Sequence, residues 1–314
     1  MTKLFDTVAL IGIGLIGSSI SHATRRGGLA GRIVGSAKTE ATRATALRLG
    51  LVDEAFESAA DAVRNADLVI LCTPVRACGP VAAEIAGSLK PGAILTDVGS
   101  VKGSVLADVA PHVPKGVHFI PGHPIAGTEH SGPESGFAEL FDGRWCVLTP
   151  PPGADAAAVD RLRNFWKGLG SNVEVMTADH HDMVLAITSH VPHLIAFNIV
   201  NTAAHLERVT ESEVIKFSAG GFRDFTRIAA SDPTMWRDVF LTNRGAMIEM
   251  LGRFIEDLLH LQRAMRFGDG ETLFRMITEA RSLRRGIIQA GQDTSAPDFG
   301  RPHGPAAAAD TTKT

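Results

Sequence analysis

The 314-residue sequence contains no tyrosine, only three cysteines and no excess of basic residues. Three is an odd number and no CxxC pair is present, so we expect reduced thiols, with Cys72 and Cys146 buried in apolar, strand-like runs. A net charge of −3 leaves no broad basic surface, which argues against nucleic acid as a partner. The absence of tyrosine excludes no fold class and no function.

The N-terminal segment MTKLFDTVALIGIG also lacks the features of a membrane span or a leader peptide. Its apolar run is too short to cross a bilayer, ends in glycines and is followed by no small-residue cleavage site. We therefore interpret it as a buried first strand. On this basis we expect a cytoplasmic protein that has no membrane partner.

The first half of the chain alternates short apolar runs with Ala-rich stretches that are typical of helices. At about 150 residues per domain, a chain of 314 residues is expected to form two domains. Strand-helix alternation predicts an α/β fold, with a Rossmann-type parallel sheet covered on both faces. The predicted strands are Val8–Ile11, Ile33–Gly35, Leu68–Cys72, Ile94–Thr96, His118–Ile120, Trp145–Leu148 and Val173–Met176, with a helix over Asp155–Leu169 before the last one.

From Ala178 onwards the pattern predicts helices alone. We expect a helix over Asp179–His205, interrupted by Pro192, and another that begins at Asp232-Pro233 and runs to about Phe267. Its apolar residues cover more than one face, which favours both a domain core and a contact with a second subunit. The predicted domains are 1–176 for NAD(P) binding, 177–291 for substrate binding and homodimer formation, and a disordered tail over 292–314.

A glycine-rich turn follows the first strand and precedes a helix. The pattern GxGxxG in this position is typical of dinucleotide binding. The first glycine permits the tight turn, the second lets a pyrophosphate approach the backbone, and the third lets the helix pack on the strand. The helix N-terminus then presents free N–H groups to the phosphates. The residues of this predicted cofactor site are Gly12, Ile13, Gly14, Leu15, Ile16 and Gly17.

The end of the second strand lacks the acidic residue that marks a preference for NAD. Ser36, Lys38 and Thr39 stand there instead and are compatible with a 2′-phosphate, so NAD, which we favour slightly, and NADP both stay open. Thr73-Pro74 follows the third predicted strand. It is either a further cofactor contact or a plain proline turn.

Polar residues gather in three further stretches: DVGSVKG from Asp97, GHPIAGTE from Gly122, and SHVPH from Ser189 with GGFRDFTRIAASDPTMW from Gly220. Together with the glycine turn, in this order from about residue 6 to residue 290, they resemble the prephenate/arogenate dehydrogenase family. The resemblance implies a Rossmann domain followed by a helical dimerisation domain. No chorismate mutase segment or regulatory domain flanks these motifs, so we expect a monofunctional enzyme.

The resemblance also implies a reaction. The substrate is a cyclohexadiene with a ring carboxylate and, opposite it, a carbon that bears a hydroxyl group. Hydride passes from that carbon to the nicotinamide, the hydroxyl proton is taken by a base, and loss of CO₂ makes the ring aromatic. His123 of GHP is the expected base, since histidine titrates near neutral pH. Ser100 matches the serine that hydrogen-bonds this site, and His193 is the expected substrate-side histidine.

Further residues are expected around the substrate. Arg227 is the candidate for binding a carboxylate, because its planar guanidinium group forms two parallel hydrogen bonds, and Asp224 would orient it or pair with it. Without an HExxH spacing, the histidines predict no metal site, and we expect His180 and His181 in an exposed helical turn. The other expected substrate contacts are Thr128, Glu129, His190 and Trp236, of which Trp236 is either a core residue or, as the resemblance implies, one that reaches the site of the partner subunit.

Two alternatives stay open. One is a β-hydroxyacid or 6-phosphogluconate-type dehydrogenase, which joins the same two kinds of domain but normally uses a lysine in the second. The other is a protein that senses a nucleotide without catalysis. Within the favoured family, the sequence does not choose between prephenate and arogenate.

Overall fold

The computed structural model of the chain describes residues 3–128, 130–210 and 219–289. Its contacts divide the chain into two units, Met1–Leu251 and Gly252–Thr314. Most of the helices that follow residue 176 belong to the first unit, and the domain boundary at that residue stays a prediction. The tail predicted over 292–314 lies outside the described residues.

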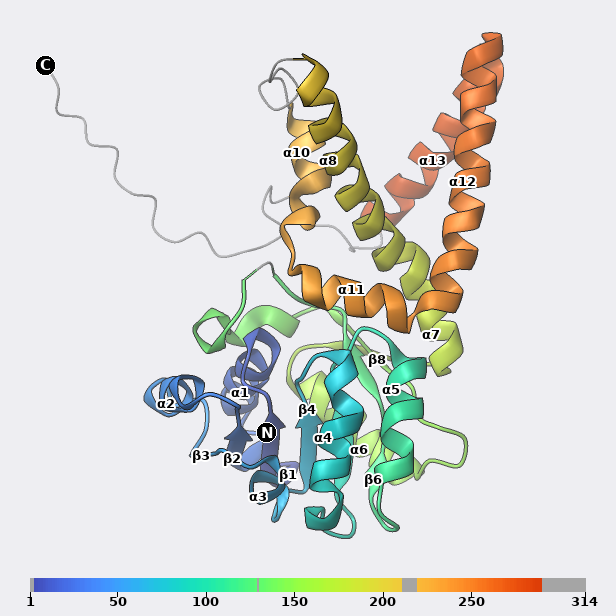
Figure 1. The fold of residues 1–314 in the computed structure, drawn as a ribbon. Helices are drawn as coiled ribbons and strands as arrows, with labels where there is room; N and C mark the ends of the chain where they lie inside the picture. The colour runs from blue at the N-terminus through green and yellow to red at the C-terminus, as the bar shows by residue number, and fades with distance from the viewer. Residues whose placement is uncertain (1–2, 129, 211–218, 290–314) are drawn as a thin grey trace, which may run out of the picture. The chain divides into compact units, whose positions relative to one another are not determined.

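A six-stranded parallel sheet forms the centre of the first unit, with strand order β3-β2-β1-β4-β5-β6 (Figure 1). A second sheet, β7-β8-β9, pairs β7 antiparallel to β8 and β8 parallel to β9. The strands are β1 (Phe5–Ile11), β2 (Ala30–Ser36), β3 (Glu54–Phe56), β4 (Leu68–Leu71), β5 (Ile94–Asp97), β6 (His118–Phe119), β7 (Gly122–Pro124), β8 (Trp145–Leu148) and β9 (Asn172–Val175).

The strand order reverses between β1 and β4, because β2 pairs with one side of β1 and β4 with the other. Val8 of β1 pairs with Ile33 on one side and with Leu68 on the other. The carboxyl edge at such a reversal is where open α/β sheets bind ligands. The glycine turn begins directly after β1, so this topology brings it to that edge.

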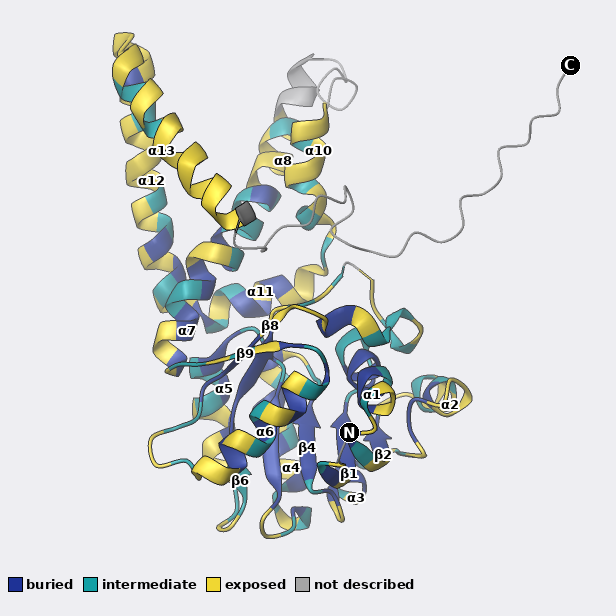
Figure 2. Cartoon of the chain, turned by 180° about the vertical axis from the view of Figure 1, so that it is seen from behind, coloured by how far each residue is buried: buried dark blue, intermediate teal, exposed yellow. Residues whose placement is uncertain are grey.

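Two layers of helices cover the parallel sheet. α1 and α6 lie on the face seen in Figure 2, and α3, α4 and α5 cover the opposite face, seen in Figure 1. All four residues of β4 are buried, as expected for a strand between two layers. The helices are α1 (Leu15–Gly27), α2 (Glu40–Arg48), α3 (Ala59–Val63), α4 (Cys78–Ile85), α5 (Lys102–Val109), α6 (Ala156–Gly168), α7 (Ala178–Leu185), α8 (Val191–Thr210), α10 (Gly220–Thr226), α11 (Pro233–Thr242), α12 (Arg244–Phe267) and α13 (Gly270–Gln289).

The expected fold class, a Rossmann-type parallel sheet followed by helices, is confirmed. Two strands, β3 and β7, were not predicted from the sequence. β3 has three residues and none is buried, and β7 consists of Gly122, His123 and Pro124, of which the first and last disfavour strands. The three cysteines are free.

The predicted long helix from Pro233 to Phe267 is wrong in one respect, because Asn243 divides it into α11 and α12. It begins as expected, with the Asp232 carboxylate accepting a hydrogen bond from the Met235 backbone N–H at 2.7 Å. The Asn243 side chain donates to the Asp182 carbonyl at 2.9 Å, and this contact holds the break against α7.

The predicted interruption at Pro192 is also displaced. The irregular turn is a π-helical turn over Ala186–His190, and Pro192 stands in the first turn of α8, where proline is tolerated. By length and composition the segment Ala178–His205 is apolar enough to cross a membrane. Its N-terminal part is tied to the first unit by the polar contacts of the buried His181, Asp182 and His190, whereas most residues of α8 are exposed or half-buried.

The second unit has large apolar side chains in contact with solvent. In α13, Phe274 is 74% exposed and Leu283 is 73% exposed, which is unusual for large apolar side chains of a protein that acts as a monomer. Others in the same unit are Ile255, Leu258, Leu259, Met265, Phe267, Ile277 and Ile287. Exposed apolar surface of this kind is typical of a contact with another protein.

Candidate active site

The glycine turn has the geometry that each of its glycines was expected to supply. Gly12 has φ +100°, and a Cβ there would lie 2.5 Å from the Cys72 carbonyl oxygen. A Cβ at Gly17 would lie 2.4 Å from the Gly12 carbonyl oxygen, so α1 packs closely on the turn. A Cβ at Gly14, by contrast, would meet no atom within 4 Å. The backbone is therefore open at the N-terminus of α1, where a pyrophosphate would bind, and these residues fit a dinucleotide.

The end of β2 lies beside the turn, since the Gly12 N–H donates to the Ser36 carbonyl at 2.9 Å. Ser36 is buried, Lys38 is exposed, and Thr39 caps α2 by accepting from the Thr42 N–H. Arg43, which sequence reasoning missed, donates to the Ala37 carbonyl at 2.7 Å. It also donates to the Lys38 carbonyl at 3.3 Å and so holds the loop between β2 and α2.

Thr73 and Pro74 follow β4 at the same edge. The Thr73 methyl group lies 3.4 Å from the position of a Cβ on Gly12, so this turn adjoins the glycine turn. The Thr73 hydroxyl group lies 3.7 Å from the Cys78 sulfur. Pro74 is exposed and precedes a short helical turn, Val75–Ala77.

His123 lies in β7 and is only 8% exposed. A fully buried lysine, Lys102, holds this strand against the end of β5. Its ammonium group donates to the Asp97 carboxylate and, at 2.7 Å, to the Gly122 carbonyl. Asp97 also accepts from the Gly122 N–H at 3.1 Å. The lysine and aspartate of the DVGSVKG stretch therefore position the strand that carries the histidine.

His181 contacts His123 directly, and the expectation that it is exposed is wrong. It is fully buried, with its Nε2 atom 2.8 Å from Nδ1 of His123 and its Nδ1 atom 2.8 Å from the Asp182 carboxylate. His180 is exposed, as expected. Sequence reasoning treated the two neighbours alike, although α7 turns one toward solvent and the other toward β7.

The histidine cluster, by which we mean His123, His181, His190 and His193, is held in the neutral state. Burial lowers the pKa of His123 well below its ordinary value, and the nearby His181, Lys102 and His190 lower it further. Burial also lowers the pKa of His181, partly offset by the Asp182 hydrogen bond. A neutral imidazole has a lone pair that can accept a proton or a hydrogen bond, and the lowered pKa makes His123 a weaker base than free histidine.

His190 and His193 project from the end of the π-helical turn and the start of α8. His190 is fully buried, and Asn243 lies 3.0 Å from its Nδ1 atom. Burial is the main cause that lowers the pKa of His190 to about 4. Nδ1 of His193 lies 2.8 Å from the Ser189 carbonyl oxygen, and its ring stacks on Trp236 with 3.7 Å between centroids. Trp236 is 6% exposed and also contacts His190.

Arg227 follows α10 and is exposed. Burial and, after it, the positive charge of Arg227 lower the pKa of His193, against a hydrogen bond to Ser189 that raises it. This electrostatic effect links the arginine to the histidine cluster. Asp224 stands three residues earlier, on α10, and is also exposed.

The remaining predicted residues are less closely tied to the cluster. Ser100 is half-buried in the turn between β5 and α5. The Thr128 hydroxyl group accepts from the His130 N–H at 3.2 Å, and Glu129 lies outside the described residues. Within the described ranges, no three side chains gather in a way that would hold a metal ion.

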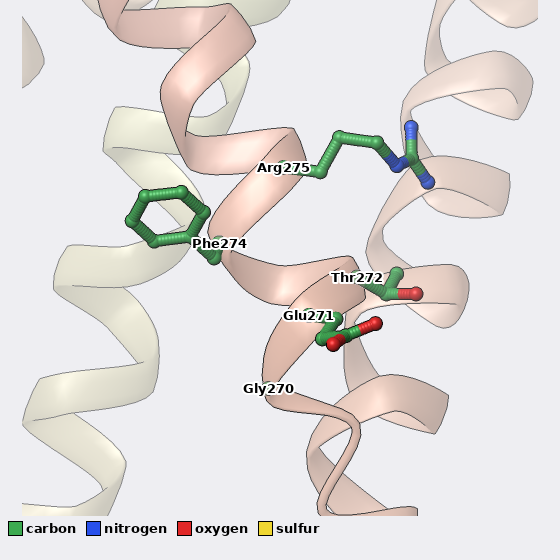
Figure 3. A pocket seen from close by; sticks show the side chains of 5 residues that line it. All are labelled: Gly270, Glu271, Thr272, Phe274 and Arg275. Carbon is green, nitrogen blue, oxygen red and sulfur yellow. The ribbon is translucent and has the colours of Figure 1, made fainter.

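A hollow of about 550 Å³ opens elsewhere, at the start of α13. It is lined by Gly270, Glu271, Thr272, Phe274 and Arg275. Phe274 and Arg275 project to opposite sides of the helix (Figure 3). Because polar groups do not converge there, it is a weaker candidate for a substrate site than the histidine cluster.

The chain matches two family models in succession. Residues 20–175 match the nucleotide-binding domain of prephenate dehydrogenase, and residues 177–279 match its dimerization domain. A cyclohexadienyl dehydrogenase of Zymomonas mobilis is 41% identical, over 90% of this chain and 96% of the relative. A prephenate dehydrogenase of Bacillus subtilis is 35% identical, over 91% of this chain and 77% of the relative.

Solved structures agree with these matches. Prephenate dehydrogenase from Aquifex aeolicus, in complex with hydroxyphenyl propionate and NAD+, superposes with a TM-score of 0.84 at 35% identity, covering 90% of this chain and 98% of that one. The arogenate dehydrogenase of Synechocystis superposes with a TM-score of 0.77 at 26% identity, covering 90% and 99%.

Proposed function

Because the chain belongs to the prephenate dehydrogenase family and is an NAD-dependent prephenate or cyclohexadienyl dehydrogenase, we propose that its histidine cluster is the site where a cyclohexadiene acid is oxidised and decarboxylated. The observation that carries this proposal is the buried, neutral His123 on the strand that adjoins the end of β5. The reaction belongs to tyrosine biosynthesis, and we propose that it takes place in the cytoplasm.

His123 acts as the base. It takes the proton of the substrate hydroxyl group as the C–H bond on the same carbon breaks, which typically accelerates such a step by about 10²–10⁴-fold. A nicotinamide cofactor held at the glycine turn would supply the acceptor for the hydride, that is, for the hydrogen and both electrons of that bond. The C–C bond to the ring carboxylate then breaks, CO₂ leaves, and the electron pair of that bond completes the aromatic ring, whose oxygen takes the proton back from His123. We assign Ser100 to a hydrogen bond with the same hydroxyl group, because it stands in the turn that follows β5.

Arg227 binds a substrate carboxylate, and His193 contacts the substrate side chain. Since a carbonyl oxygen only accepts, the contact with Ser189 requires a proton on Nδ1 of His193. Nε2 of the neutral ring is then an acceptor, which suits the ammonium group of arogenate, whereas Trp236 holds the ring in place. We therefore propose that the enzyme accepts arogenate as well as prephenate, with Asp224 and Thr128 near the pocket and the fully buried His190 supporting it from behind.

The experiment is a steady-state measurement with each substrate, under NAD+ and NADP+ separately. We expect turnover with both substrates and a preference for NAD+. An NADP+ preference would instead implicate Lys38 and Arg43 at the end of β2 in binding a 2′-phosphate. Absence of product from either cyclohexadiene acid, with turnover of a β-hydroxyacid, would contradict the proposed function.

We also propose that the exposed apolar side chains of the second unit form a homodimer contact. Replacement of Phe274 by Ser, at 74% exposure, then removes contact area between subunits without disturbing the core of one chain. Analytical ultracentrifugation should give a dimer for the wild type and a raised dissociation constant for Phe274→Ser. Replacement of the exposed Lys38 by Ser is the matched surface control. A monomeric wild type at micromolar concentration would contradict the homodimer.

A further inference from the structure

Two side chains, His181 and Asp182, follow one another behind the proposed base, His123. Nδ1 of His123 lies 2.8 Å from Nε2 of His181, and Nδ1 of His181 lies 2.8 Å from the Asp182 carboxylate. His123 and Asp182 are 8% exposed and His181 is fully buried. Water therefore does not compete for these hydrogen bonds.

The Asp182 carboxylate is held in place from the other side. It accepts from the backbone N–H groups of Lys102 at 2.7 Å and Gly103 at 2.8 Å, which are the first residues of α5. A Cβ on Gly103 would lie 2.9 Å from this carboxylate, so the glycine leaves room for it. With its Asn243 contact as well, Asp182 is anchored by two elements distant in sequence.

The proton positions follow from this anchor. An ionised carboxylate only accepts hydrogen bonds, so Nδ1 of His181 carries a proton. Nε2 of the neutral His181 is then an acceptor, and Nδ1 of His123 must donate to it. The opposite arrangement would bring the lone pairs of the Asp182 oxygen and His181 Nδ1 together at 2.8 Å.

We propose that His181, fixed by Asp182, is a positioning residue that sets the tautomer of His123 and leaves Nε2 of His123 unprotonated toward the substrate. This inference rests on the proposed role of His123 as the base. When His123 accepts the proton, its Nδ1–H stays bonded to His181.

The tautomer is measured directly by ¹⁵N NMR of histidine-labelled protein, with the His123 signals assigned from a His123→Asn variant. In the wild type we expect the proton of His123 on Nδ1, which is the minority form of free neutral histidine. In His181→Phe we expect it to move to Nε2. His180→Phe, the same substitution at the exposed neighbour, should leave the wild-type pattern. A proton on Nε2 of His123 in the wild type would overturn the proposal.

Kinetics supply the second readout. We expect His181→Phe to lower kcat by about 10–100-fold, within the contribution of a positioned base, while KM for substrate and cofactor stays within about twofold. His181→Gln keeps an acceptor near the position of Nε2 and should recover part of kcat. His180→Phe should behave as the wild type.

The variants separate the failure of this inference from that of the proposed function. If His181→Phe does not fold, the wild-type tautomer and the His181→Gln kinetics still decide. If His181→Gln is no better than His181→Phe and the tautomer is unchanged in both, His181 has only a structural role. If His123→Ala retains turnover, the proposed base is wrong, whatever the tautomer.

Discussion

The glycine turn and the histidine cluster are built in opposite ways. The turn consists of six consecutive residues, and its function depends on backbone atoms and on absent side chains. The cluster draws side chains from β7, α7 and α8, about 70 residues apart, and braces them with Asp97, Lys102 and Asn243. The first is a local pattern and the second is a product of packing. Substitutions should therefore affect them differently.

The largest expected effect concerns the cluster. His123→Ala should lower kcat by about 10²–10⁴-fold, because the substrate hydroxyl group loses its base, and should leave KM little changed. Arg227→Ala should do the reverse and raise KM by about 10–100-fold, since the charge that binds a carboxylate is lost. Steady-state kinetics on folded variants, checked by circular dichroism, measure both. Unchanged turnover of His123→Ala would refute the base assignment.

The glycine turn allows a sharper test within one motif. Gly17→Ala places a Cβ 2.4 Å from the Gly12 carbonyl oxygen, so we expect a loss of stability of about 1–3 kcal/mol even without cofactor. In Gly14→Ala the new methyl group contacts no protein atom, so the variant should keep the wild-type melting temperature. It should weaken cofactor binding by about tenfold or more, because the methyl group occupies space that the pyrophosphate needs.

Thermal unfolding without cofactor and isothermal titration with NAD+ separate these two effects. Equal melting temperatures for Gly17→Ala and Gly14→Ala would show that close packing at the turn is not what Gly17 provides. Unchanged NAD+ affinity in Gly14→Ala would contradict the site of the pyrophosphate.

The smallest expected effect is a loss of stability in acid, which should come from the histidine cluster and not from the glycine turn. An unfolded histidine takes a proton near pH 6.5, whereas folded His190 does so at about 4. The unfolded chain therefore binds more protons within this window. Stability should be unaffected by this group above pH 6.5 and fall as the pH drops from 6.5 to 4, by up to about 3 kcal/mol.

Urea unfolding at a series of pH values measures this loss. His190→Asn should make the stability less dependent on pH in that window, with the remaining dependence due to His123, His181 and His193, whose pKa values are also lowered. The exposed His180→Asn should leave the pH dependence unchanged. A wild-type stability that is constant from pH 6.5 to 4 would contradict a neutral, buried His190.

Much of the fold was readable in the sequence. The apolar runs predicted seven strands, and Asp155 and Asp232 marked the starts of α6 and α11 through caps that the structure contains. β7 was missed because glycine and proline flank His123, and β3 because it is too short and too exposed to leave an apolar pattern. The break at Asn243 was missed because its side chain bonds to residues 53 and 61 positions away.

By itself the sequence determined the alternation of strands and helices, the glycine turn and the motifs that resemble a family. These depend on interactions between near neighbours, on backbone freedom and on side-chain periodicity, which a linear pattern records. Only the tertiary structure decided that His181 is buried against His123 while His180 faces solvent, that Lys102 is a buried brace, and that Asp182 caps α5 from another helix. Such pairs join distant residues, and burial strengthens them by excluding water, so no local pattern carries them.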